Sequence, residues 1–131
     1  MLPSEYLTTA ADILSKPNGW CQGTSNRDID GKPISHGEEG IVSQCLDGAI
    51  YGLALARHRN GLVANVVEQI SEYKAAIEYL EDAIRAYTTV ETNGKKTYKT
   101  LVEFNDENGQ TQDNIVQFLR SIAAQAAAAG K

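Results

Sequence analysis

The longest regular pattern in the chain is an apolar stripe that runs from residue 63 to residue 87. Its members alternate at steps of three and four, which places them on one face of an α-helix because a turn takes about 3.6 residues. The stripe consists of Val63, Val66, Ile70, Tyr73, Ile77, Leu80, Ile84 and Tyr87. Such a face is covered either by other helices of the same chain or by a second copy. The first arrangement is favoured, and homo-oligomerisation through residues 63–87 stays open as the alternative.

Two segments that precede the stripe also have the spacing of helices. Residues 3–16 start with a proline, whose missing N–H costs nothing at the first helical position, and their apolar side chains share one face. A second helix is predicted over residues 38–59, with Val42 and Cys45 on its apolar face. Three small residues of that helix form a smooth strip at which another backbone can come close: Gly48, Ala49 and Gly52.

The remaining segments predict one loop, one hairpin and two more helical stretches. Residues 20–36 are polar and rich in turn residues, which predicts a long ordered loop. Asn93-Gly94 between two β-favouring runs predicts a hairpin. The segment Thr100–Glu103 fits a capping box that opens a short helical turn. Thr111 caps a last helix, whose alanine-rich tail over residues 124–131 buries little and is expected to fray.

These patterns together predict one mainly α domain over residues 1–131. The length of 131 residues lies near the commonest size of a single domain, and a hydrophobic content of 42% is enough for a core. The expected architecture is a bundle of about four helices with one inserted β-hairpin and a long ordered loop.

The charge of the chain limits its classes of partner. There are 12 Lys and Arg against 17 Asp and Glu, which gives a net charge of −5 without a basic stripe. We therefore expect no nucleic-acid partner, because nucleic acids are bound through clustered cations. No apolar run approaches the ~18 residues of a membrane span, and the start of the chain lacks the positive residues of a signal peptide. A cytoplasmic protein without membrane contact is expected.

The two cysteines are expected to be free thiols in a reducing compartment. They lack the close sequence pairing of zinc ligands, so neither a metal nor another cofactor is expected. Cys45 fits a small core residue. Cys21 lies in a loop and is the better candidate for a reactive thiol, for which only His36 and His58 are available as a base.

Two polar loops form the candidate site. Trp20, Cys21 and Gln22 follow the first helix, and Asn105-Asp106 precede the last one. Because the end of the first helix and the start of the fourth lie at the same end of an antiparallel bundle, we expect the two loops to meet. Trp20 could stack on a planar ligand while Gln22 hydrogen-bonds to it. The alternative, which we favour, is a scaffold in which Trp20 closes the core and Gln22 satisfies loop backbone.

Short motifs recur in a fixed order over most of the chain, from about residue 7 to residue 122. They are Ala10-Ala11-Asp12, Gly19-Trp20-Cys21-Gln22-Gly23, Asp30-Gly31, Cys45-x-x-Gly48-Ala49, Asn105-Asp106 and Gly109-x-Thr111. In these motifs the chain resembles an uncharacterised bacterial and phage family, domain of unknown function 6197. It departs from the family pattern at Gln44 and Phe104, where a Trp is typical, and the hairpin at Asn93-Gly94 resembles an insertion. The resemblance implies no activity, only a small intracellular protein often encoded on mobile elements.

The sequence contains no catalytic constellation, which favours a binding protein over an enzyme. The leading hypothesis is a non-catalytic binding module, a phage or prophage accessory protein that binds and modulates a host protein. The alternative is a binder of a planar or nucleotide-like small molecule, or an enzyme, that uses Trp20–Gln22 and Asn105-Asp106. A deep cleft between these loops would favour the small molecule, and a flat or convex surface would favour a protein partner.

Overall fold

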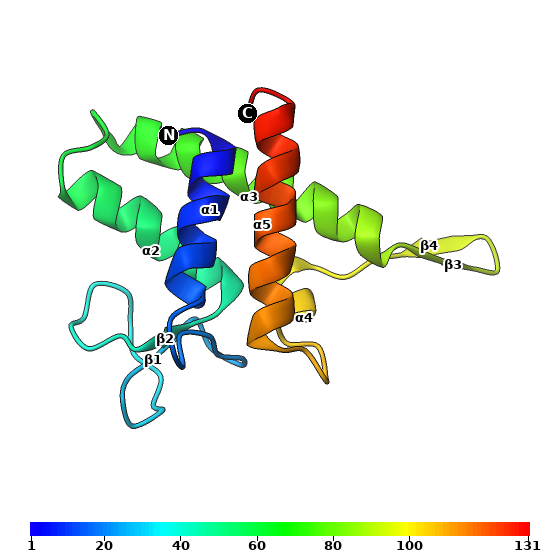
Figure 1. The fold of residues 1–131 in the computed structure, drawn as a ribbon, viewed down its shortest axis with the longest axis horizontal. Helices are drawn as coiled ribbons and strands as arrows, with labels where there is room; N and C mark the ends of the chain where they lie inside the picture. The colour runs from blue at the N-terminus through cyan, green and yellow to red at the C-terminus, as the bar shows by residue number, and fades with distance from the viewer.

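The computed structural model describes residues 1–131 as five helices and two pairs of short antiparallel strands. The helices are α1 (Pro3–Leu14), α2 (Leu46–Arg59), α3 (Val66–Thr88), α4 (Leu101–Asn105) and α5 (Gln112–Ala128). The strand pairs are β1 (Asn26–Arg27) with β2 (Ser43–Gln44) and β3 (Val90–Thr92) with β4 (Lys95–Thr97). α1 and α5 lie side by side and antiparallel across α3, and the β3–β4 hairpin projects from the end of α3 (Figure 1). The expected mainly α fold, with four long helices and one hairpin, is confirmed.

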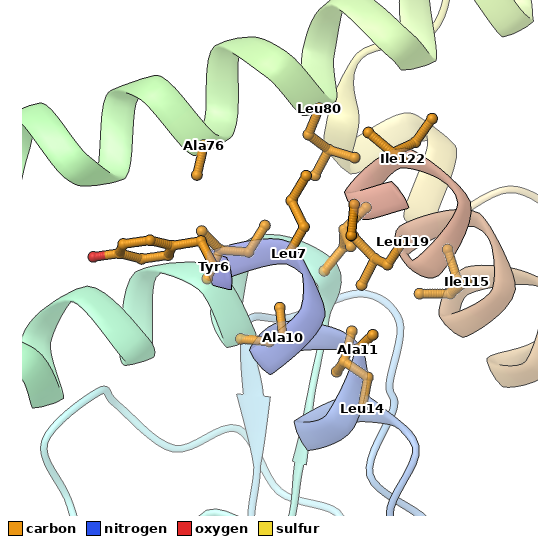
Figure 2. Packing of buried hydrophobic residues seen from close by; sticks show 14 of the residues in the cluster. Tyr6, Leu7, Ala10, Ala11, Leu14, Ala76, Leu80, Ile115, Leu119 and Ile122 are labelled. Atoms are coloured by element: carbon orange, nitrogen blue, oxygen red, sulfur yellow. The ribbon is translucent and has the colours of Figure 1, made fainter. Parts of the chain in front are cut away.

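The core is built around α1. Five of its side chains are buried to the last atom: Tyr6, Leu7, Ala10, Ala11 and Leu14. Figure 2 shows Leu7 directed toward Leu80 of α3, with Leu119 of α5 beside it, and the ring of Tyr6 directed away from α5, below Ala76 of α3. α3 contributes Ala76 and Leu80 to this packing, and α5 contributes Ile115, Leu119 and Ile122. No helix combines the length and the apolar character that crossing a lipid bilayer requires.

α2 starts later than predicted, and the helix expected over residues 38–59 is wrong in its first part. Gly40 has a φ of 98°, which an α-helix does not accept. Cys45 is the N-cap of α2, and its Sγ accepts a hydrogen bond from the N–H of Gly48 at 3.2 Å. Cys45 therefore lies at the helix end and not on an apolar helical face, although it is buried as expected. Val42 lies outside the helix and is exposed.

The smooth strip on α2 is occupied by the long loop. A Cβ added to Gly48 would lie 2.2 Å from the carbonyl oxygen of Ser25, a distance that no real side chain tolerates. The predicted close approach of another backbone is therefore confirmed at this residue. Since the same loop carries β1, the glycine positions the β1–β2 pair against the start of α2.

The apolar stripe on α3 is buried only in part. Leu80 and Ile84 are fully buried, whereas Val66, Ile70 and Tyr87 are exposed. α3 is longer than two of the helices that pack on it, since its 23 residues span about 35 Å while α1 and α2 have only 12 and 14 residues. α2 lies along the first half of α3, where Arg57 contacts Glu72, but it leaves the side that carries Val66 and Ile70 in solvent. In the last turn, Tyr87 also stays exposed.

The C-terminal half of the chain follows the prediction. Thr100 forms the expected capping box with Glu103 at the start of α4. Asn93 and Gly94 have φ of 53° and 76°, which suits the tight turn between β3 and β4. The alanine-rich tail is helical as far as Ala128. Of residues 124–131 only Ala126 is buried, which agrees with the expectation that the tail buries little, and its fraying stays a prediction.

An ion pair joins the end of α2 to the start of α3. The guanidinium of Arg57 donates from Nε to Glu72 Oε2 at 2.8 Å and from Nη2 to Oε1 at 3.0 Å. The hydroxyl of Tyr6 donates to the same carboxylate at 3.4 Å. The hydrogen bonds from Arg57, and after them the bond from the amino group of Met1 at 2.8 Å, lower the pKa of Glu72 from 4.5 to about 2. The carboxylate thus links α1, α2 and α3 as long as it is ionised.

The buried part of α3 should dominate its contribution to stability. Leu80→Ala removes fully buried methyl groups and leaves a cavity, so we expect it to lower the free energy of unfolding by about 2–5 kcal/mol. Val67→Ala trims an exposed side chain on the same helix and should change it by less than about 0.5 kcal/mol. Urea denaturation measures both values. Equal losses at the two positions would contradict the assignment of Leu80 to the core.

The Arg57–Glu72 pair should make stability depend on acidity. Because the pKa of Glu72 is depressed in the folded protein, its contribution is complete above pH 4.5 and is lost as the pH falls toward 2. Glu72→Gln should therefore be less stable than wild type at neutral pH, with a difference that shrinks on acidification. Equilibrium unfolding over a pH series tests this. The exposed Glu78→Gln is the control and should follow wild type throughout; a pH-independent loss in Glu72→Gln would refute the linkage.

Candidate functional site

The two predicted polar loops lie together at one end of the molecule. The amide of Gln112, at the start of α5, donates to the carbonyls of Leu14 and Lys16 at 2.7 and 2.8 Å, as the antiparallel arrangement of α1 and α5 requires. The indole Nε1–H of Trp20 donates to Asn105 Oδ1 at 2.8 Å. The expected meeting of the loops is confirmed, although their sequence separation is large.

Asn105 is the centre of this contact and uses its whole side-chain bonding capacity within the protein. Only 1% of the residue is exposed. Its Oδ1 accepts from Trp20 and from the N–H of Leu46, the latter at 2.9 Å. Its Nδ2 donates to the carbonyl of Cys21 at 3.1 Å and to Asp106 Oδ1 at 2.9 Å. An amide has two donor hydrogens and two acceptor lone pairs, so Asn105 has none left for a ligand.

Gln22 and Asp106 complete what we call the Asn105 cluster: Trp20, Cys21, Gln22, Asn105 and Asp106. Gln22 Nε2 donates to the carbonyls of Asn105 and Glu107 at 3.0 and 3.1 Å. The N–H of Gly23 donates to Asp106 Oδ1 at 3.1 Å. The structure thus brings all five predicted residues together, and most of their bonds end on loop backbone. That pattern favours the scaffold interpretation, because a ligand site would leave polar groups free.

The cavity beside the Asn105 cluster is small. It has a volume of about 120 Å³, below the roughly 300 Å³ at which small-molecule sites begin. Its lining includes Gly23, Cys45, Asp47, Val102 and Asp106. No deep cleft separates the two loops, so the criterion for a small-molecule site at this place is not met.

Both cysteines are free and buried. Burial raises the pKa of the Cys21 thiol and of the Cys45 thiol, which disfavours the thiolate that a nucleophile needs. Cys21 Sγ lies 3.6 Å from the carbonyl oxygen of Thr24, to which it donates. The ring of His36 packs edge-on against Tyr51 with centroids 4.8 Å apart, and burial lowers its pKa. The geometry therefore gives no support to Cys21 as a reactive thiol.

Besides a cavity of about 640 Å³ between α1 and α5, two more cavities larger than the one at the Asn105 cluster lie outside the predicted site. One of about 680 Å³ runs along α2 beneath the segment that carries His36, and its lining includes Lys16, Leu53 and Arg59. The other has about 520 Å³ and lies between the end of α3, the turn at residues 107–110 and α5. Its exposed aromatic residue, Tyr87, was assigned to the buried stripe by its spacing, so sequence reasoning missed it. No three His, Cys, Asp or Glu side chains are grouped to hold a metal ion.

The comparisons with known proteins define the class of the chain but not an activity. Residues 1–125 match the model of a protein family described as a family of unknown function, DUF6197. The chain therefore belongs to this family, as the order of its motifs indicated. Neither the curated proteins nor the solved structures contain a match.

If the Asn105 cluster is a scaffold, removing its centre should destabilise the fold. Asn105→Ala leaves the buried donors of Trp20 and Leu46 without an acceptor, so we expect a loss of about 1–3 kcal/mol in the free energy of unfolding. The exposed neighbour Asn108→Ala should change it by less than about 0.5 kcal/mol. Urea denaturation followed by the fluorescence of the single Trp measures both. A neutral Asn105→Ala would contradict the scaffold role and favour a site.

Proposed function

We propose that this domain is a non-catalytic protein-binding module whose contact surface is the exposed apolar start of α3. One observation carries this proposal. Four large apolar side chains are exposed in the connection from α2 to α3 and in the first turns of α3. Leu62 is 60% exposed, Val66 54%, Val67 76% and Ile70 49%. Neighbouring exposed apolar residues of this kind mark interaction surfaces in soluble proteins. We call them the Val67 patch.

The arrangement of the Val67 patch suits a partner with an apolar groove. Val66 and Ile70 are four residues apart on α3, so they lie one above the other on the same face of the helix. A helix that presents side chains at this spacing can lay its face into a hydrophobic groove of another protein. The Arg57–Glu72 ion pair also fixes the start of α3 to α2, so this part of the helix is already positioned before a partner binds.

A groove in a different protein fits the patch better than a second copy of this chain. A coiled coil needs apolar seam positions over about three to four heptads. Among the large apolar side chains of α3, the exposed group at its start ends at Ile70, and the next exposed one is Tyr87 near the other end of the helix. Between them, the exposed side of the helix carries Lys74 and Glu78. The seam is therefore too short for a stable pair of α3 helices. In keeping with the mobile-element origin that the family resemblance implies, we take the partner to be a host protein that this domain modulates.

The proposal is tested with a photo-crosslinking side chain at position 67 in the otherwise intact chain, added to lysate of a candidate host. The matched control carries the same group at position 75, an exposed alanine of the same helix away from the patch. We expect one protein to be crosslinked from position 67 and not from position 75. An excess of wild-type protein without the photo-crosslinking group should suppress this crosslink. Val67→Glu should fail to compete, whereas Ala75→Glu should compete fully.

Other outcomes of this experiment would overturn the proposal. Crosslinking to a second copy from position 67, with a dimeric mass in solution, would replace the groove partner by homo-oligomerisation through residues 63–87. Equal labelling from positions 67 and 75 would show that the patch binds no specific protein. Both glutamate variants should retain the thermal stability of wild type because they replace exposed residues, which separates lost binding from unfolding.

A further inference from the structure

We propose that the cavity of about 520 Å³ at the opposite end of α3 is a binding site for a neutral nucleobase or nucleoside. This site is independent of the Val67 patch and of the Asn105 cluster. It is formed by four parts of the chain: Tyr87 in the last turn of α3, Phe104 of α4, the turn at residues 107–110, and the first turns of α5. The volume lies within the range of roughly 300–1,000 Å³ that small-molecule sites occupy.

Tyr87 offers a ring on which a planar ligand can stack. It is 74% exposed although it belongs to the apolar stripe of α3. Its ring is nevertheless fixed by two phenylalanines, with a centroid 6.2 Å from Phe104 in an edge-on arrangement and 5.6 Å from Phe118. Phe104 and Phe118 in turn lie 4.7 Å apart. Proteins stack nucleobases on aromatic rings of this kind, which are fixed by neighbouring side chains and are open to solvent on another side.

Side-chain amides surround this ring. Asn114 and Gln117 are three residues apart on α5, so they share one face of the helix beside Phe118. Both are exposed, both line the cavity, and neither amide is hydrogen-bonded within the protein, in contrast to Asn105. Asn108 adds a further exposed amide from the turn opposite. An amide donates and accepts in one plane, which matches the paired acceptor and donor on the edge of adenine.

The charges of the site select an uncharged ligand. No Lys or Arg lines the cavity, so a phosphate group would meet no cation. The one acidic residue of the lining, Glu107, is paired with Lys99. Stacking on Tyr87 and bonding to amides therefore points to a base or a nucleoside and not to a nucleotide or a nucleic-acid strand. This agrees with the net acidic charge of the chain.

The test uses adenosine as the probe and the full chain labelled with nitrogen-15. We expect saturable shifts of the side-chain amide resonances of Asn114 and Gln117 on titration. Tyr87→Ala should weaken binding at least about tenfold because it removes the stacking ring. Tyr98→Ala is the matched control, since Tyr98 is also exposed and lies directly after β4, outside the cavity, and it should bind like wild type.

A second variant tests the site separately, in case Tyr87→Ala loses binding because it no longer folds. Asn114→Asp keeps the size of the side chain, and a carboxylate near the N-terminus of α5 is favourable for the helix. It removes the amide donors, so it should weaken adenosine binding while the fold is retained. Adenosine 5′-monophosphate should bind no more tightly than adenosine.

Three results would overturn the assignment. One is the absence of saturable shifts with adenosine up to ~10 mM, the weak end of the affinity scale. Another is binding that Tyr87→Ala and Asn114→Asp leave unchanged. The third is a preference of the same residues for N-acetylglucosamine over adenosine, which would assign the cavity to saccharides.

Discussion

The bonds of Asn105 connect parts of the chain that no helix holds together. The segment after α1, the first residue of α2 and the end of α4 all meet at this one side chain. A buried amide lowers the free energy of the fold only if every donor and acceptor finds a partner, because each unsatisfied group costs most of its desolvation energy. Here all four positions are used. Asn105 thus fixes the start of the long loop at Cys21 and its junction with α2 at Leu46, while bonds such as those of Arg27 to the Gln22 carbonyl and of Gln44 to Asn26 hold the loop between them.

The second constraint is the unequal length of the helices. α3 is much longer than the helices that pack on it, so one core cannot cover it from end to end. α2 lies along its first half, and α1 and α5 lie against its middle (Figure 1, Figure 2). One side of its first turns and Tyr87 in its last turn stay exposed. The start carries the Val67 patch, and the last turn carries Tyr87. The packing of α3 thus leaves exposed the two surfaces to which we assign the proposed binding functions, on a domain whose predicted polar site is filled by its own bonds.

Much of the fold could be predicted because its signals are local. Pro3 at the start of α1, Asn93-Gly94 between two strands and Thr100 with Glu103 at α4 each act within a few residues. The start of α2 was missed because apolar spacing alone favoured a helix over residues 38–59. In the structure, the hydrogen bonds of Ser43 and Gln44 go to β1 and to neighbouring loop segments. Such pairing joins residues far apart in the sequence and leaves no local periodicity.

The sequence by itself determined the types of element, the turn positions and the residues that would meet around Asn105, since these follow from helical spacing, capping and the antiparallel order of helices. Only the tertiary structure decided which of these residues are free to act. Asn105 and Gln117 are both amides, yet the first is saturated by its neighbours and the second is open to solvent. Val66 and Leu80 lie on the same stripe, yet only Leu80 is covered. Exposure and unused bonding capacity depend on what packs against a residue, and that is a property of the whole chain.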